Sequence, residues 1–268
     1  MLFIMNIVKK DKKNNQILGS NPEMIKSTIT FTGNNNRLIC EEGITLQNSR
    51  INFLGDNSII YLSKPRKNYQ LHIPIYSNSV LFFDEYVTTN GLLRMALSEE
   101  KNIIIGKSCL FSFGIWFRLA DPHLIYESIN KRRINLSKSI YIGDHVWIGQ
   151  DSLILKGTSV GSGSIIGAKS VVSNKHINSN TIWAGNPVKE LKKDIFWDIQ
   201  SVHRFNEEDT EKSLYFDDDC WIYEKDNTAL NINAIENKLK NMNVDEKVEY
   251  LIKLRNNNDK NRFYMQKE

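Results

Sequence analysis

Cysteine is scarce in this 268-residue sequence and provides no structural framework. The three cysteines, Cys40, Cys109 and Cys220, are far apart and odd in number. Disulfide-stapled folds and paired-cysteine metal sites need even sets of cysteines at short spacings. The count therefore excludes both classes and suits a reducing compartment.

Long apolar runs are missing too, and none approaches the ~18 residues of a membrane-spanning helix. The apolar start, Met1–Val8, is short, and Lys9, Lys10, Lys12 and Lys13 follow it. A signal peptide has its positive charges before the apolar stretch, so this order argues against one. We therefore expect a cytoplasmic protein with no membrane span.

Neither sign of charge is in strong excess, since the formal net charge is +4. This value does not by itself argue for a nucleic-acid partner, and none is expected. A local cluster of Lys and Arg could nevertheless hold a cofactor that carries phosphates. The length allows one substantial core, with or without a small appendage.

The sequence does contain a repeat of period six. From Ile142 it reads IGDHVW, IGQDSL, ILKGTS, VGSGSI, IGAKSV and VSNKHI. The second position is Gly in four of these six hexads, and the fifth is mostly small. The first position is always β-branched and aliphatic: Ile142, Ile148, Ile154, Val160, Ile166 and Val172.

This register predicts a triangular coil in which each hexad forms one flat side. The first residue of a hexad then points to the axis and stacks on the residue three hexads later. β-Branched side chains suit a stacked, extended backbone, and neighbouring coils bury each other's faces. We attribute the second-position glycines to relief of the backbone where the chain bends. An amphipathic helix or a hairpin sheet would have a different period.

Other segments set the domain boundaries. Ile105, Phe111 and Phe117 extend the register upstream, and residues 28–62 are interpreted as irregular coils. We expect an N-terminal segment at 1–27, the β-helix at 28–193 and an extension at 194–268. The polar stretch 118–139 breaks the period and must leave the coil as an excursion loop, a common carrier of function. Pro187 cannot continue a ladder and marks the end of the coil.

Two helices are expected in the extension, and the tail 256–268 is expected to be frayed. Asn243 and Glu246 can cap the second helix. The predicted apolar face of the first helix is formed by Ile232, Ile235, Leu239 and Met242. That of the second helix is formed by Val244, Val248, Leu251 and Ile252. The predicted fold is thus mainly β: a parallel β-helix with an excursion loop and a short α-helical extension.

The hexads and the ending WAGNPVKELKK resemble the hexapeptide-repeat acyltransferase family. The stretch DPHLIYESINKRRINLSKSIYIGDHVWIG, followed by LILKG, is similar to bacterial sialic acid or capsular polysaccharide O-acetyltransferases. The fold resemblance covers residues 28–197 and the site resemblance covers 121–191. It implies a left-handed β-helix, a homotrimer with acetyl-CoA between neighbouring β-helices, and transfer to a hydroxyl of an oligo- or polysaccharide. No metal is implied.

The same resemblance implies three catalytic residues. His123 would act as the general base on the acceptor hydroxyl, since imidazole can take a proton near neutral pH. Asp121 would hold the imidazole tautomer, or would simply cap the turn before Pro122. The indole N–H of Trp147 could meet the thioester oxygen or hold the sugar ring, or the side chain could cover a coil face. An exposed loop histidine without a role is the alternative for His123.

Five residues are expected to bind acetyl-CoA. Lys156 and Lys189 match family positions and suit phosphates, although lysines often only solvate the end of a coil. Gly167, Ala168 and Pro187 would let the cofactor approach the backbone.

Tyr126 and His145 are assigned to the acceptor. For His145 a contact at a subunit interface or in the cofactor pocket is an equal alternative, because it occupies an outward hexad position.

Three other functions are alternatives. A hexapeptide acetyltransferase could act on an antibiotic, a small metabolite or a nucleotide-sugar amine. A γ-carbonic-anhydrase-like enzyme would need three converging histidines, and His123, His145 and His176 include no close ligand pair. A non-catalytic β-helix would present a regular face of Thr or aromatic residues, and the sequence has none.

Overall fold

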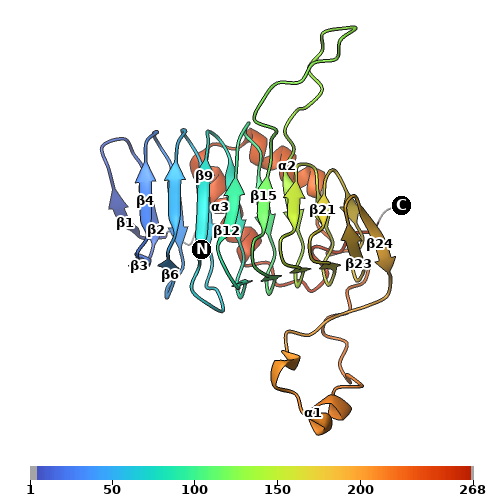
Figure 1. Cartoon of the computed structure of the whole chain (residues 1–268). Coiled ribbons are helices and arrows are strands. Elements are labelled where there is room, and N and C mark those ends of the chain that lie inside the picture. The colour runs from blue at the N-terminus through green and yellow to red at the C-terminus, as the bar shows by residue number, and fades with distance from the viewer. Residues whose placement is uncertain (1–4, 267–268) are drawn as a thin grey trace.

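Parallel sheets wind into a three-sided coil. The computed structural model describes residues 5–266, so the expectation for Met1–Val8 can be followed only from residue 5. It confirms the left-handed parallel β-helix with few helices (Figure 1). We name the sides face 1, face 2 and face 3, in the order in which the chain passes them.

Each face is built from strands that recur at every coil. Face 1 is a nine-stranded sheet of β1 (Ile7–Lys10), β2 (Gln16–Gly19), β5 (Arg37–Cys40), β8 (Ile59–Leu62), β10 (Val80–Phe83), β13 (Ile103–Ile105), β16 (Ile140–Ile142), β19 (Ser159–Val160) and β22 (His176–Ile177). Face 2 has six strands, β11 (Thr88–Thr89), β14 (Leu110–Phe111), β17 (Trp147–Ile148), β20 (Ile165–Ile166), β23 (Ile182–Gly185) and β24 (Val188–Lys192). Face 3 has seven, β4 (Thr28–Phe31), β7 (Arg50–Phe53), β9 (Leu71–Ile75), β12 (Leu93–Ala96), β15 (Trp116–Arg118), β18 (Leu153–Leu155) and β21 (Val171–Val172). In the first coils a pair, β3 (Glu23–Ile25) and β6 (Thr45–Gln47), stands between face 1 and face 3.

The first residues of the hexads form the axis of the coil, as predicted. Each pairs with the residue three hexads later: Ile142 with Val160 on face 1, Ile148 with Ile166 on face 2, and Ile154 with Val172 on face 3. All six are at most 1% exposed. Burying one such side chain contributes roughly 1.5–3 kcal/mol, so this column is a main source of stability.

The second-position glycines have a different cause from the predicted one. Gly143 and Gly149 do not adopt the left-handed backbone conformation that favours glycine. A Cβ on Gly143 would lie 2.6 Å from the backbone nitrogen of Ser162, and one on Gly149 would lie 2.5 Å from that of Ala168. Both contacts are with the next coil. Close stacking of coils, and not relief at a bend, therefore requires glycine there.

The early coils are longer than the later ones but are not irregular. Thr30 and Asn52, on adjacent strands of face 3, are 22 residues apart, whereas Asp144 and Ser162 in the hexad region are 18 apart. The extra residues form turns that are held by a ladder of asparagines. The Asn14 amide donates to Asn35 at 2.7 Å, and the Asn35 amide donates to Asn57 at 2.8 Å. All three have positive φ, which Asn tolerates better than most residues.

Antiparallel strands close both ends of the coil. β1 pairs with β2 at one end and β24 with β23 at the other, which protects the two sheet edges. The coil begins at Gln16, earlier than the expected boundary at residue 28. Pro187 follows a cis peptide bond and lies in the turn between β23 and β24. The chain turns back at this point, and the parallel ladder ends there as predicted.

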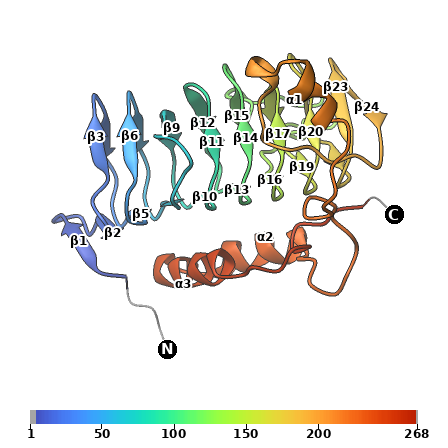
Figure 2. The ribbon, with the colours of Figure 1, turned by 90° about the horizontal axis from the view of Figure 1, so that it is seen from below.

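The extension contains the two expected helices. It holds η1 (Val202–Arg204), α1 (Glu207–Lys212), α2 (Ile232–Asn241) and α3 (Val244–Arg255). Asn243 and Glu246 form the predicted capping box. α2 and α3 run back along face 1 (Figure 2). Their apolar residues share a core with the outer side chains of that face, including Tyr61, Phe82 and Tyr141.

The tail beyond α3 is fixed and not frayed. Arg262 is fully buried, and its guanidinium donates to both carboxylate oxygens of Asp144 at 2.9 and 2.8 Å and to Asp84 at 2.5 Å. It also donates to the carbonyls of Leu254 and Asn257. A buried charge is tolerated when it is paired and hydrogen-bonded in this way. The expectation for 256–268 is therefore wrong for the described residues up to 266.

Candidate functional site

The excursion loop is an ordered arm that leaves the corner between face 3 and face 1. We define the arm as residues 119–139, which connect β15 to β16. It projects from the coil in Figure 1. The backbone N–H of Glu127 donates to the carbonyl of Arg132 at 2.9 Å, and that of Ile134 donates to the carbonyl of Ile125 at 3.0 Å. The arm is thus a two-stranded ribbon that can hold its side chains in position.

Asn135 fixes the backbone around His123. Its amide nitrogen donates to the His123 carbonyl at 2.7 Å and to Asp121 Oδ2 at 3.4 Å. Its amide oxygen accepts from the backbone N–H of Ile125 at 3.0 Å and from Arg133 Nε at 3.2 Å. Asn135 is buried although its neighbours in the arm are exposed. This role could not be predicted from the sequence, because the residue lies in a polar loop without a period.

Two residues that were assigned to different roles form an ion pair at the base of the arm. Lys156 Nζ lies 2.6 Å from Asp121 Oδ2 and 3.1 Å from the carbonyl of Asn135. The hydrogen bond from Lys156 lowers the pKa of the Asp121 carboxyl. Asp121 was expected to orient His123 and Lys156 to bind phosphate. In the isolated chain they hold the arm together, and both assignments remain predictions.

Several apolar side chains of the otherwise polar arm are exposed to solvent. His123 is exposed, and Tyr126 is 54% exposed. Leu124, Ile129 and Ile134 are 60%, 89% and 62% exposed. Several large apolar side chains exposed on one short segment suit a contact with another molecule.

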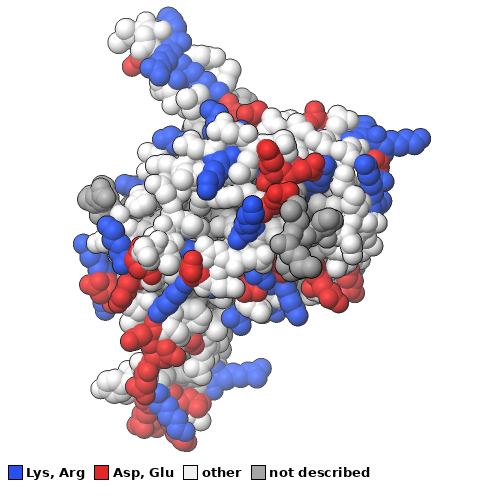
Figure 3. All heavy atoms as spheres, turned by 180° about the vertical axis from the view of Figure 1, so that it is seen from behind, with Lys and Arg blue, Asp and Glu red and all other residues white. Residues whose placement is uncertain are grey.

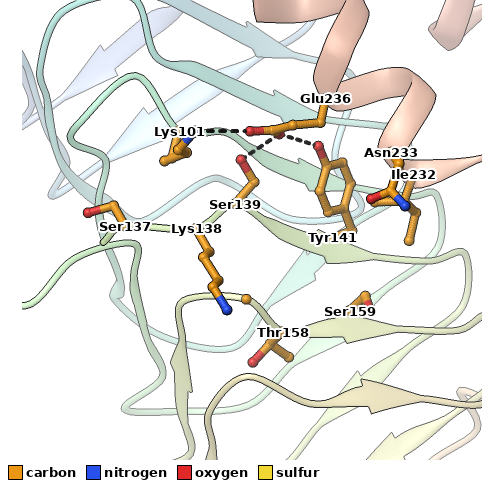
Figure 4. A pocket seen from close by; sticks show the side chains of 11 residues that line it. Lys101, Ser137, Lys138, Ser139, Tyr141, Thr158, Ser159, Ile232, Asn233 and Glu236 are labelled. Atoms are coloured by element: carbon orange, nitrogen blue, oxygen red, sulfur yellow. Dashed lines mark hydrogen bonds and ion pairs between the residues drawn. The ribbon is translucent and has the colours of Figure 1, made fainter. Parts of the chain in front are cut away.

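A polar hollow of about 290 Å³ lies between the returning arm and α2 (Figure 4). Glu236 lines this hollow. Its carboxylate accepts hydrogen bonds from Ser139 Oγ at 2.7 Å and from Tyr141 OH at 2.6 Å. Burial by itself raises the pKa of Glu236, but these hydrogen bonds lower it overall. The hollow therefore lies where the base of the arm meets the helical extension.

Trp147 lies on face 2, on the side of the coil opposite the corner that carries the arm. It belongs to β17, is 36% exposed, and its Nε1 donates to Ser112 Oγ at 3.4 Å. The chain passes face 1, face 2 and face 3 in turn, so the corner between face 3 and face 1 faces away from face 2. Within one chain, His123 and Trp147 therefore lie on opposite sides of the coil.

Four of the five predicted cofactor residues lie on the side of Trp147. Gly167–Ala168 directly follows β20, where face 2 turns into face 3. Pro187 lies in the β23–β24 turn, and Lys189 pairs with Ala184 within that hairpin. A Cβ on Gly167 would lie 2.7 Å from the Cβ of Ala184, so hairpin and corner are adjacent.

The predicted site thus falls into two groups. The arm half contains His123, Asp121, Tyr126 and Lys156. The face-2 half contains Trp147, Gly167, Ala168, Pro187 and Lys189.

His145 belongs to neither half. Its ring is stacked between Trp197 at 3.9 Å and Trp221 at 3.6 Å, within 8° of parallel, and it is 1% exposed. Its Nε2 is 2.8 Å from the carbonyl of Trp197. Burial lowers the pKa of His145 to about 4. Its surroundings are those of a packing residue that fastens the extension to the coil, which leaves no room for a sugar in this conformation.

Two further features of the described residues concern function. No group of three or more His, Cys, Asp or Glu side chains within residues 5–266 could hold a metal ion. In the same part of the chain, none of the helices combines the length and apolar character required to cross a bilayer.

With this geometry described, the chain can be compared with known proteins. The bacterial transferase hexapeptide model of six repeats matches residues 139–174. The chain carries the hexapeptide repeat of bacterial transferases. A polysialic acid O-acetyltransferase of Neisseria meningitidis is 32% identical to this hexapeptide-repeat protein over 135 residues, which are 50% of this chain and 62% of that protein. One of Escherichia coli O1:K1 / APEC is 38% identical over 110 residues, which are 41% of this chain and 36% of that protein. The matched part is therefore less than two thirds of either relative.

Solved structures extend the likeness over more of the hexapeptide-repeat protein. The polySia-specific acetyltransferase NeuO superposes with a TM-score of 0.62 at 29% identity, over 71% of this chain and 90% of that one. The polysialic acid O-acetyltransferase OatWY gives 0.62 at 28% identity, over 75% and 96%. The predicted resemblance is confirmed.

The His145 stack generates a pH prediction. Because the folded state lowers the pKa of His145 to about 4, the unfolded chain takes up this proton first as pH falls below about 6.5. Stability is then lost between pH about 6.5 and about 4, by on the order of 1–3 kcal/mol for this group. His145→Phe keeps a flat ring and cannot be protonated. Its melting temperature should fall less than that of the wild type over this window, and parallel melting profiles would contradict the account.

The Asn135 contacts generate a second prediction. Asn135→Ala removes four hydrogen bonds of a buried amide, so the arm should open more often. Loss of these hydrogen bonds lowers the free energy of opening the arm by about 1 kcal/mol or more in total. Hydrogen exchange of the Glu127 and Ile134 amides should therefore rise by about tenfold. The control is Asn130→Ala, whose exposed amide makes two hydrogen bonds confined to the tip of the arm, one to Glu127 and one from the backbone N–H of Arg132 at 2.8 Å. Equal exchange in both variants would show that Asn135 does not order the arm.

Proposed function

We propose that this protein is an acetyl-CoA-dependent O-acetyltransferase. The acceptor is a sugar hydroxyl of a capsular polysaccharide, with a sialic-acid polymer as the first candidate. The single observation that carries the proposal is that one chain presents both an exposed histidine on an ordered arm and an exposed tryptophan on the hexapeptide coil. The names of the relatives agree with this chemistry and suggest the acceptor.

The proposal requires a homotrimer, because each half of the site needs its counterpart from another copy. A ring of three copies has three identical heterologous interfaces, and each can bring one arm to one face 2. The exposed apolar side chains of the arm suit such a contact.

In the proposed reaction His123 accepts the proton of the acceptor hydroxyl as its oxygen attacks the thioester carbonyl. The acetyl carbon–sulfur bond breaks, and coenzyme A leaves as its thiol. Asn135 and the Asp121–Lys156 pair position His123 through the arm. The indole N–H of Trp147 in the neighbouring copy donates to the developing charge on the carbonyl oxygen.

The remaining residues of the face-2 half bind the donor. Lys189 pairs with a phosphate of the donor, and Gly167, Ala168 and Pro187 present little side chain to it. Since acetyl-CoA is an intracellular metabolite, this reaction assigns the protein to the cytoplasm.

His123→Ala tests the proposal directly. Loss of a general base should lower turnover by about 10²–10⁴-fold while acetyl-CoA affinity stays nearly unchanged. The assay is thiol release from acetyl-CoA with polysialic acid, together with the mass of the acetylated sugar. His203→Ala, which removes an exposed histidine of the extension, is the matched control. Near-normal turnover of His123→Ala would exclude this base, and no acetylated sugar with the wild type would exclude this function.

A further inference from the structure

A row of cationic and aromatic side chains crosses the uncovered outer surface of face 3. In register, Arg50 lies beside His72, His72 beside Arg94, and Arg94 beside Trp116. Arg118 follows on the same side of β15, two residues after Trp116. Adjacent strands are about 4.8 Å apart, so the row repeats its side chains at that spacing along the coil axis. We call these five residues the arginine–tryptophan strip.

Trp116 is the centre of the strip. It is 40% exposed, and the guanidinium carbons of Arg94 and Arg118 lie 5.8 and 5.7 Å from the centroid of its ring. Pro74 and Ala96 leave a shallow hollow of about 210 Å³ beside it. A flat aromatic ring between two guanidinium groups can hold the apolar face of a sugar while the cations meet a carboxylate.

No side chain of the strip forms an ion pair with residues 5–266, although Arg118 is near enough to Asp121 for its charge to help lower the pKa of that carboxyl. On the seven described strands of face 3, the outward positions include three arginines and a histidine but no carboxylate. The ion pairs that arginines form in the described chain involve Arg37, Arg133, Arg255 and Arg262 instead. α2 and α3 cover face 1 and leave face 3 open (Figures 1 and 2).

We propose that the arginine–tryptophan strip binds the anionic polysaccharide acceptor along the coil axis. This inference rests on the proposed function and adds a second binding region for the same polymer. β15 carries Trp116 and Arg118 and leads directly into the arm, so a chain lying on the strip runs toward His123. The strip holds the polymer, and successive sugars can then reach the arm.

A linear polymer suits the strip better than another protein segment. One carboxylate per sugar can follow cations that repeat at every coil. The competing occupant is the acidic segment 198–219 of a second copy, which has eight carboxylate side chains and two basic ones. Four of these carboxylates lie within the six-residue helix α1, on the projection that carries a cluster of acidic side chains in Figure 3, and not on an extended segment that could follow the coil axis.

The experiment measures polymer binding without catalysis. Affinity electrophoresis in gels that contain long-chain polysialic acid should retard the wild type. The variant Arg94→Gln/Arg118→Gln should bind about tenfold more weakly, since it loses two charge contacts from half-buried side chains. The control Lys238→Gln/Lys240→Gln removes the same charge from α2, including a cation stacked on Tyr250, and should bind like the wild type. Added salt should weaken wild-type binding.

The outcomes separate this inference from the proposed function. If wild-type binding is absent, or equals that of the arginine variant, the strip is not the docking region. If the arginine variant changes the sedimentation of the protein, face 3 is a contact between copies and the inference is overturned. If the polymer binds the strip but the wild type releases no thiol, the proposed function fails while the strip stands.

Kinetics give a second, independent measurement. Trp116→Ala and the arginine variant should raise KM for long chains about tenfold and leave KM for a short sialic acid oligosaccharide and kcat nearly unchanged. An equal change for long and short acceptors would place these residues in the reaction centre instead of the strip and would overturn the inference.

Discussion

In a coil with three sides, the position of a residue in its hexad fixes both its direction and its face. The first residue must enter the axis, and the second must be small where the next coil passes within contact distance of its Cα. Functional side chains must therefore come from the remaining, outward positions. A functional group on one face cannot be moved to another without an insertion. The arm is such an insertion, and the corner from which it leaves decides which partner it can meet.

The C-terminal extension adds a second constraint. Its helices cover face 1, and Arg262 ties its tail to Asp84 and Asp144, which follow β10 and β16 in the two coils on either side of β13. Trp197 and Trp221 clamp His145 at the corner between face 1 and face 2. Face 1 is therefore unavailable to substrates. Face 2, face 3 and the arm remain, and these are the surfaces that carry the candidate site and the arginine–tryptophan strip.

Much of the fold could be predicted because the hexads are local and periodic. The column from Ile142 to Val172, the end of the parallel ladder at Pro187 and the Asn243 cap follow from spacing alone. The longer coils at residues 28–62 were interpreted as irregular, since their repeat of 21 or 22 residues is not a multiple of six and glycine stacks there only as the pair Gly33 and Gly55. The tail was misjudged because its order depends on Arg262 meeting carboxylates that are distant in sequence. For the same reason the sequence did not reveal Asn135, or that Lys156 pairs with Asp121.

The central claim is that each site joins the arm of one copy to face 2 of the next. Subunit mixing tests it most directly. His123→Ala and Trp147→Ala should each be nearly inactive alone. After dissociation and reassembly in equal amounts, most trimers contain both variants, and each mixed trimer has one site with both residues intact. Acetyl-transfer activity should then return to about a quarter of the wild-type value. No recovery, with exchange of subunits verified by mass, would contradict a shared site.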